Sequence, residues 1–398
     1  MPIRPTSFAF TVLLAGMTAL PALSIDMSLP ALPILQQRFA VGAGEAGLTL
    51  SLFMAGFAAS QLVLGPLSDR IGRRPVLLGA VGLYTLGALL CALSPSMALL
   101  NASRLLQGAG AAGGVAMALA VVRDLFSGAA ARVKLSYVAV VVGIAPIVGP
   151  TIGALLLAVA HWRAIFALHA AAGLAVALAV TLGLRETRPG VAARPGVLAS
   201  YVRMLTHRRA MWSAVVNGMS FGCLFSYISG SPLLFMGALK VSTSTYGLLF
   251  ACTAASITLG SWLNGVLTAR RVPARTLLAI GLFVAVAGTA VLTGLTMGSR
   301  LSLGMLMPLL MLTMFSRGLV GPNATHAAIE PLPEIAGLAS SVTVFLQMVA
   351  ATAVSATVAG LYPLLGPPAM AGMMAACALA ALGAWRMAAG GRPRLRAA

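Results

Sequence analysis

The stretch Gly65-Pro66-Leu67-Ser68-Asp69-Arg70-Ile71-Gly72-Arg73-Arg74-Pro75 decides the fold of this chain. It places three arginines and one aspartate between two long apolar runs, the first starting near Gly47 and the second ending near Leu93. Each run is about as long as the roughly 20 residues that a helix needs to cross a bilayer. We therefore expect the charged stretch to be a loop at a membrane surface, between two spanning helices.

The composition of the whole chain also indicates a membrane protein. Of its 398 residues, 60% are hydrophobic and 8% are charged, whereas about a quarter are charged in a soluble domain. The mean hydropathy is +0.98. We predict an all-α membrane protein, and we expect its first apolar run to be retained as a span because no cleavage site follows it.

The apolar runs predict twelve spanning helices in two pseudo-symmetric six-helix bundles. The first six lie roughly at residues 8–30, 44–66, 75–94, 97–121, 134–158 and 162–184. The second six lie roughly at residues 211–237, 243–268, 276–296, 303–325, 337–361 and 368–388. A basic segment rich in proline and glycine separates the two sets. We thus predict bundles at 1–184 and 211–388, a cytoplasmic linker at 185–210 and a cytoplasmic basic tail at 389–398.

The distribution of lysine and arginine predicts the orientation. With both ends in the cytoplasm, the inner segments hold 20 of the 26 basic residues and the outer loops hold four. This bias is typical of a cytoplasmic N- and C-terminus. It also explains the net charge of +19 by topology and contact with anionic lipids, so we expect no nucleic-acid partner. The four cysteines lie singly in apolar runs, without the spacing of a metal site.

A faint internal repeat supports the two halves. A shift of 195 residues aligns Gly65 with Gly260 and Asp69 with Asn264, and Arg270 and Arg271 follow the second pair. Two similar halves of six spans favour a transporter with its substrate path between them.

Asp26 is the one carboxylate that the predicted spans place inside the membrane. A buried carboxylate is costly and usually faces a cavity or a partner. Burial disfavours its charged form, so Asp26 could exchange a proton as access alternates between the two sides. The alternative is that Asp26 only ends the first helix, near water.

Two arginines also lie within predicted spans. Arg104 lies about two turns into the fourth span, and Gln107 follows one turn later on the same face. Arg104 either couples protons or substrate, or binds backbone carbonyls of a neighbouring helix as a structural group. Arg317, in the tenth span, either lines a cavity or reaches the inner interface.

Two further features indicate moving parts or a cavity. The fifth span contains Pro146, Gly149, Pro150 and Gly153, which favour a bendable, closely packed seam. Aromatic residues near the seventh span, such as Tyr227, could line an adaptable cavity, although such residues are more often packing.

The opening stretch has two interpretations. Asp69 could accept hydrogen bonds from the start of the eleventh span, near Gly337, and pair with Arg123. Such a latch would close the cytoplasmic side, and we expect it to involve Gly65, Asp69, Arg70, Gly72, Arg73, Arg74, Arg123 and Asp124. The alternative is that the arginines only enforce topology.

Several stretches, in order along the chain, resemble the Bcr/CflA group of drug–proton antiporters within the major facilitator superfamily. They begin at Ile25, Gly65, Arg104, Val122, Trp162, Tyr227 and Gly321. The resemblance implies export of small hydrophobic or amphipathic drugs, such as phenicols or bicyclomycin, driven by inward proton flow. It implies Asp26 as the protonation site, Arg104 as its coupling partner and the fifth-span seam as the antiporter motif. We also expect a substrate cavity lined by Gln107, Tyr227, Arg317 and Asn323.

The resemblance also sets expectations about cofactors and alternatives. We expect a monomer in the bacterial inner membrane that needs no cofactor or metal because the proton gradient drives it. Gly153 is followed by Ala154 where the group's pattern ends in two glycines. Export of a metabolite such as a peptide or sugar is the alternative function. An enzyme or a sensor is disfavoured, since the four histidines are scattered and no output domain is present.

Overall fold

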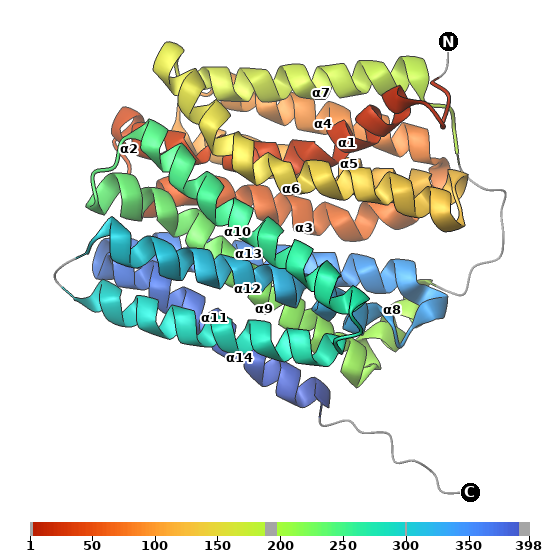
Figure 1. The fold of residues 1–398 in the computed structure, drawn as a ribbon. Helices are drawn as coiled ribbons and strands as arrows, with labels where there is room; N and C mark the ends of the chain where they lie inside the picture. The colour runs from red at the N-terminus through yellow and green to blue at the C-terminus, as the bar shows by residue number, and fades with distance from the viewer. Residues whose placement is uncertain (1–2, 188–196, 299–300, 390–398) are drawn as a thin grey trace, which may run out of the picture. The chain divides into compact units, whose positions relative to one another are not determined.

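The structure is a computed structural model, and it describes residues 3–187, 197–298 and 301–389 (Figure 1). Throughout these ranges the regular elements are helices, and no strand occurs among them. Twelve of the described helical segments are long and apolar enough to cross a membrane. The predicted all-α fold with twelve spanning helices is therefore confirmed.

The helices of the first half follow the predicted spans closely. They are α1 (Phe8–Asp26), α3 (Ala43–Ile71), α4 (Arg73–Leu93), α5 (Met97–Leu125), α6 (Gly128–Val159) and α7 (Arg163–Gly183). After α1, the short helices η1 (Leu29–Ala31) and α2 (Leu32–Phe39) continue the chain to the start of α3. Asp26 is thus the last residue of a helix that is followed by further helical turns.

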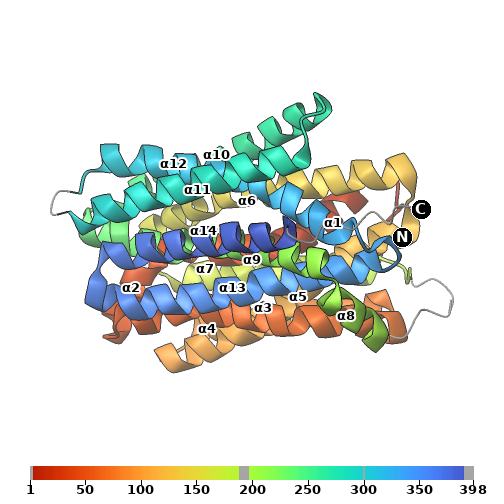
Figure 2. The ribbon, with the colours of Figure 1, turned by 90° about the horizontal axis from the view of Figure 1, so that it is seen from below.

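The helices of the second half also match their predicted spans. They are α9 (Arg208–Pro232), α10 (Thr243–Ala269), α11 (Ala274–Met297), α12 (Leu303–Ile329), α13 (Ala336–Leu365) and α14 (Pro367–Ala389). A π-helical stretch, η2 (Leu233–Ala238), extends α9, and the 3-10 turn η3 (Pro333–Ile335) precedes α13. Figure 2 shows α11 and α12 side by side, and the two helices pack against each other.

The segment predicted as a linker contains a helix of its own, α8 (Val197–Thr206). Met204 of α8 is fully buried and packs in an apolar cluster with Leu332 and Ile335. Ion pairs join Arg203 to Glu334 and Arg209 to Glu330 in the same region. This packing explains why the short segment Val197–Thr206 forms a helix, which the proline and glycine content of the linker did not predict. Residues 188–196 of the predicted linker and 390–398 of the predicted tail lie outside the described residues.

The expectation that Gly65 to Pro75 forms a loop is wrong. Helix α3 continues through Ile71 and α4 begins at Arg73, so only Gly72 interrupts the two helices. Gly72 has φ 109° and ψ 156°, a conformation that side chains disfavour and glycine tolerates. The charged stretch is therefore the end of one helix and the start of the next, which fixes the directions of its side chains.

The chain divides into two compact units that differ from the two sequence halves. One unit comprises residues 1–192, 228–254 and 355–366, and the other comprises residues 193–227, 255–354 and 367–398. Parts of α9, α10 and α13 thus belong to the first unit. Within that unit, α3 approaches α13 so closely at Gly47 that a Cβ there would overlap Ala359. The predicted bundle boundaries at residues 184 and 211 stay predictions.

Glycines set the close crossings inside each unit. A Cβ added at Gly56 of α3 would overlap the carbonyl oxygen of Leu105, and one at Gly108 of α5 would overlap that of Phe53. These reciprocal contacts bring the backbones of α3 and α5 together, as small residues do in membrane helices. They also hold the turn of α5 that carries Arg104 against the turn of α3 that carries Phe53.

The internal repeat relates different residues from those that the 195-residue shift aligned. A Cβ at Gly260 of α10 would overlap the carbonyl oxygen of Phe315 in α12, whereas one at Gly65 would meet nothing within 4 Å. The first-half glycine with an environment like that of Gly260 is Gly56. The two halves therefore share a glycine-mediated helix crossing, and the alignment of Gly65 with Gly260 is wrong.

Candidate functional site

Arg104 is a fully buried cation in the first unit. Its Nε donates to the carbonyl oxygen of Thr49 at 3.3 Å, and its Nη1 donates to Oε1 of Gln107 at 2.7 Å. Its guanidinium carbon lies 4.4 Å from the ring centroid of Phe53 and 5.8 Å from that of Phe166. A backbone carbonyl, one amide and two aromatic faces thus hold the charge, in line with both the coupling and the structural interpretations.

One donor at this position has no acceptor in the described part of the chain. It is Nη2 of Arg104, a fully buried residue, whereas the amide of Gln107 lies beside the Tyr84 hydroxyl. Leaving a buried donor unsatisfied costs about 1–3 kcal/mol, and more for a charged group. Arg104 is therefore equipped to donate to an oxygen that arrives from elsewhere.

Asp26 lies at the C-terminal end of α1 with 3% of its surface exposed. This burial disagrees with the alternative that Asp26 ends the helix near water. A Cβ added at Gly149 of α6 would lie 2.7 Å from the Cβ of Asp26, so α6 covers this carboxylate closely. Among the described residues, the structure does not join Asp26 and Arg104 by an ion pair.

The predicted seam in α6 packs directly on the end of α1. A Cβ at Gly153 would overlap the carbonyl oxygen of Met27, one residue after Asp26. Pro146 and Pro150 lie within α6 without interrupting it, although each removes one backbone donor. The seam and the candidate proton site are thus neighbours, which the sequence did not predict.

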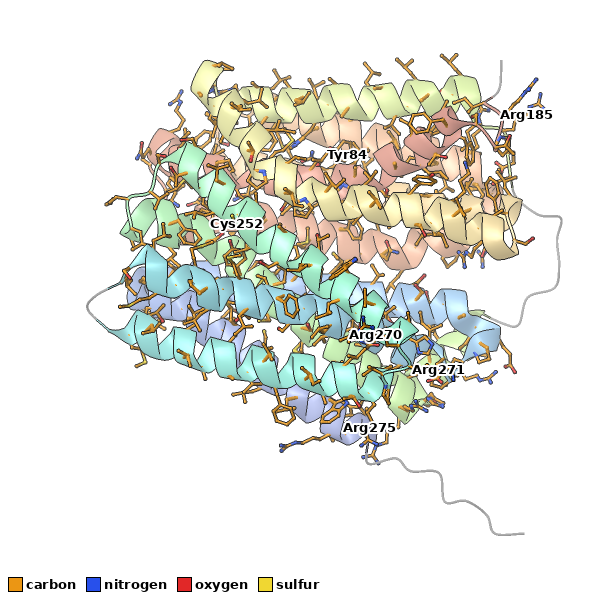
Figure 3. The ribbon with its side chains drawn as sticks, viewed as in Figure 1. Tyr84, Arg185, Cys252, Arg270, Arg271 and Arg275 are labelled. Atoms are coloured by element: carbon orange, nitrogen blue, oxygen red, sulfur yellow. The ribbon has the colours of Figure 1, made fainter. Side chains whose placement is uncertain are left out.

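Buried residues to which the sequence assigned no role lie near Arg104, among them Tyr84 and His169. Tyr84 of α4 bonds Ser24 of α1 through their hydroxyls at 2.7 Å, and Figure 3 shows Tyr84 among the first-half helices. His169 of α7 is 2% exposed, and its ring lies beside the backbone of Leu23. Phe166 lies between His169 and Arg104, with its ring centroid 6.0 Å from that of His169. A histidine in the middle of an apolar span was the available signal.

Arg73 is the centre of the predicted latch. It is 5% exposed, and its Nη1 lies 2.7 Å from a carboxylate oxygen of Asp69 while its Nε lies 3.0 Å from one of Asp124. Gly72 lets the chain turn so that this side chain reaches both carboxylates. Arg73 thus joins the two acids. Arg123 donates to the carbonyl oxygen of Leu119 in its own helix, and its predicted pairing with Asp69 stays a prediction.

Glu186 is a further member of this cluster that the sequence reasoning missed. Its carboxylate accepts hydrogen bonds from the backbone N–H of Arg73 at 2.8 Å and of Arg74 at 3.1 Å. Arg74 in turn donates to the carbonyl oxygen of Thr181 at 2.8 Å. A carboxylate at the free N–H groups of a helix start is favourable, so Glu186 caps α4 from the end of α7. Arg70 is exposed, and Gly65 has open space around it.

In the second unit, polar groups surround Arg317. Its Nη2 donates to Oδ1 of Asn217 at 3.2 Å, and Asn217 donates to the Thr325 hydroxyl at 2.7 Å. The guanidinium lies 5.7 Å from the ring centroid of Phe221. A small cavity adjoins it, lined by Ser220, Cys223, Thr313, Met314 and Ser316 among others. Arg317 therefore lies inside this unit beside a cavity.

The other residues predicted to line a substrate cavity are buried. Asn323 donates to Oδ1 of Asn264 at 2.6 Å and to the carbonyl oxygen of Leu319 at 2.8 Å, which links α12 to α10. Tyr227 is 1% exposed. Within the described residues no group of histidine, cysteine or acidic side chains could hold a metal ion.

Comparisons with known proteins identify the class. Residues 14–355 match the family model of the Major Facilitator Superfamily, so the chain belongs to this superfamily of membrane transporters. It is 32% identical to the "Uncharacterized MFS-type transporter YdgK" of Bacillus subtilis over 360 residues, which are 89% of each protein. The chain is thus a multi-pass membrane protein, and the prediction of a transporter in place of an enzyme is confirmed.

Further relatives confirm the resemblance to Bcr/CflA-type exporters. The chain is 28% identical to the "Bicyclomycin resistance protein homolog" of Haemophilus influenzae over 85% of each protein. It is 34% identical to the "Chloramphenicol resistance protein" of Pseudomonas aeruginosa, over 62% of this chain and 59% of the relative. These names indicate small-molecule substrates for the relatives.

Solved structures confirm the fold. A bacterial homologue of the human lysosomal transporter Spinster, in an inward-facing and occupied conformation, has a TM-score of 0.75 at 16% identity and covers 97% of this chain. The D-xylose-proton symporter has a TM-score of 0.74 at 17% identity and covers 96%. In both cases the match extends over at least 96% of the solved chain.

Proposed function

We propose that this protein exports small hydrophobic or amphipathic drugs, such as phenicols or bicyclomycin, in exchange for protons. The observation that carries the proposal is that one unit holds both a buried carboxylate, Asp26 on α1, and a buried guanidinium, Arg104 on α5. Ionisable groups inside spanning helices are costly and usually mark the pathway of a substrate or an ion. The names of the bicyclomycin and chloramphenicol resistance relatives support the substrate class.

In the proposed cycle, Asp26 takes up a proton when the site opens to the outside and a drug leaves. The carboxyl group is neutral while the protein changes from the outward-open to the inward-open state. The proton is released when the site opens to the cytoplasm. Arg104 would favour this release if the two groups approach each other in that state, because a positive charge close to a carboxylate stabilises its charged form. The spare Nη2 donor of Arg104 offers a hydrogen bond to an oxygen of the drug or of Asp26.

The cytoplasmic latch controls this alternation in our proposal. Arg73 holds Asp69 at the end of α3 and Asp124 at the end of α5, while Glu186 holds the start of α4. These bonds would tie three helix ends and the exit of α7 together in one conformation. In our proposal the protein is a monomer in the bacterial inner membrane. The distribution of arginine supports a cytoplasmic position for both termini.

The proposal is tested in everted membrane vesicles with an acidic lumen. Candidate drugs are added while lumenal pH is followed with a pH-sensitive dye, and vesicles without the protein serve as control. Antiport predicts that a transported drug raises lumenal pH as protons leave in exchange. If no drug among phenicols, bicyclomycin, sulfonamides and quinolones does so, proton-coupled export of these drugs is wrong, and export of a metabolite such as a peptide or sugar becomes the better hypothesis.

A further inference from the structure

Three exposed arginines gather at the turn between α10 and α11. Arg270 and Arg271 follow the last residue of α10, and Arg275 lies in the first turn of α11 (Figure 3). We call these three residues the arginine patch. Because both helices are long and apolar enough to span a membrane, the turn that joins them lies at the membrane surface.

Within the second unit, no described carboxylate is left over to neutralise the arginine patch. The chain has seven acidic residues, all within the described ranges, and none of them lies between positions 187 and 329. The two acids of the second unit, Glu330 and Glu334, pair with Arg209 and Arg203. The positive charge of the patch is therefore not matched by an acid of its own unit.

Helix electrostatics explain only part of the patch. Cations near the C-terminal end of a helix are favoured by its dipole, and this accounts for Arg270 and Arg271 at the end of α10. Arg275 lies at the N-terminal end of α11, where the same effect disfavours a cation. A patch that served the helix dipoles alone would carry no arginine at position 275.

An aromatic ring completes the surface around Arg275. Its guanidinium carbon lies 6.0 Å from the ring centroid of Trp385, on α14, which packs against α11. Trp385 is partly buried, and the exposed Arg386 follows it in sequence. Tryptophan is enriched at the level of the lipid headgroups, so the ring positions Arg275 at that depth.

We propose that the arginine patch binds the phosphate headgroup of an anionic phospholipid such as phosphatidylglycerol. Guanidinium groups bind phosphate oxygens through paired hydrogen bonds, and clusters of basic residues beside spanning helices attract anionic lipids. The acyl chains of the lipid would lie against the apolar surfaces of α10 and α11. This site goes beyond the proposed drug export, and its occupancy is measurable without any transport.

The test measures lipid binding to the purified, full-length protein in detergent by native mass spectrometry. Phosphatidylglycerol is titrated into the wild type and into the double variant Arg270→Gln/Arg271→Gln, and Arg275→Gln is tested separately. We expect affinity to fall about fivefold for each arginine removed. The control Arg38→Gln/Lys240→Gln removes two exposed charges elsewhere and should bind as the wild type does.

Two further measurements complete the test. A charge-conserving variant separates loss of binding from misfolding, and competing ligands identify what is bound. Arg270→Lys/Arg271→Lys keeps both charges and should bind more tightly than the glutamine variant. Phosphatidylcholine and inorganic phosphate should bind weakly, and 10 mM phosphate (about the order used in buffers) should leave the lipid bound. Equal binding by the glutamine and control variants, or displacement of the lipid by inorganic phosphate, would overturn the proposal.

Discussion

At the residue scale, Arg104 shows how one side chain combines several kinds of contact. A carbonyl oxygen, an amide oxygen and two aromatic rings surround its guanidinium group, and one of its nitrogens has no acceptor among the described residues. Lysine carries the same charge but lacks the planar fork that makes these contacts together. The shape of the group is therefore as important as its charge.

Replacing Arg104 by lysine should reduce drug export about tenfold or more. Each hydrogen bond to a charged group contributes about 1.5–3 kcal/mol, and the lysine would keep at most part of them. Export is measured as the rate of drug efflux from cells with equal amounts of protein in the membrane. Arg38→Lys, at an exposed position, is the matched control, and an Arg104→Lys variant with the control's efflux rate would contradict the role of the fork.

Glu186 gives a second prediction at this scale. Glu186→Gln should weaken the cap of α4 by roughly 0.3–1 kcal/mol because the negative charge at the helix start is lost. Hydrogen exchange of the Arg73 and Arg74 amides, which donate to Glu186, should accelerate by up to about fivefold. Glu45→Gln removes a charge from the first turn of α3 and should leave these amides unchanged. Unchanged exchange in Glu186→Gln would show that this cap does not hold α4.

At the scale of elements, glycines decide where helices approach one another. In α6, Gly153 faces the carbonyl oxygen of Met27 and Gly149 faces Asp26, whereas Gly143 has open space around it. One helix thus contains two glycines where an added side chain would clash with α1 and its C-terminal end, and one glycine where a side chain would fit. This contrast allows the packing of α6 on α1 to be tested within a single element.

Gly153→Ala should destabilise the protein by about 1–3 kcal/mol, since the added methyl group must displace backbone atoms. Gly143→Ala should be neutral or stabilising by about 0.5–1 kcal/mol, because alanine favours a helix over glycine. The thermal midpoint of unfolding in detergent distinguishes the two variants. Equal midpoints would mean that α6 does not pack on Met27 as described.

The elements also show what the sequence could predict. Length and hydropathy were enough to locate twelve spans, because a bilayer requires a long apolar helix at each crossing. The helical character of Gly65 to Ile71 escaped prediction, since charge was interpreted as a sign of a loop. Helix α8 escaped for a similar reason, because its stability comes from Met204 packing on residues more than 100 positions later.

At the site, the sequence predicted which residues are buried better than it predicted their partners. Asp26 and Arg104 were found because ionisable groups are rare inside apolar runs. Glu186 was missed because it lies just outside a span, and its role depends on the distant start of α4. Likewise, the neighbourhood of His169 and Tyr84 depends on how α1, α4, α5 and α7 pack, which no local pattern encodes.

At the scale of the whole molecule, the proposed function requires that proton uptake and drug release occur in the same conformational cycle. Asp26 is the only carboxylate buried within a spanning helix away from the charged cluster of Arg73 in the described chain. If Asp26 carries the proton, its replacement should uncouple transport from the gradient while leaving drug binding largely intact.

The most direct test of this claim compares wild type with Asp26→Asn in proteoliposomes, using a drug identified by the vesicle assay. Two rates are measured for each protein: drug accumulation driven by an imposed pH gradient, and exchange of labelled for unlabelled drug without a gradient. Glu45→Gln, at an exposed carboxylate, is the control and should match the wild type in both. We predict that Asp26→Asn loses gradient-driven accumulation but retains exchange. Accumulation at the wild-type rate in Asp26→Asn would contradict the account and place the proton site elsewhere.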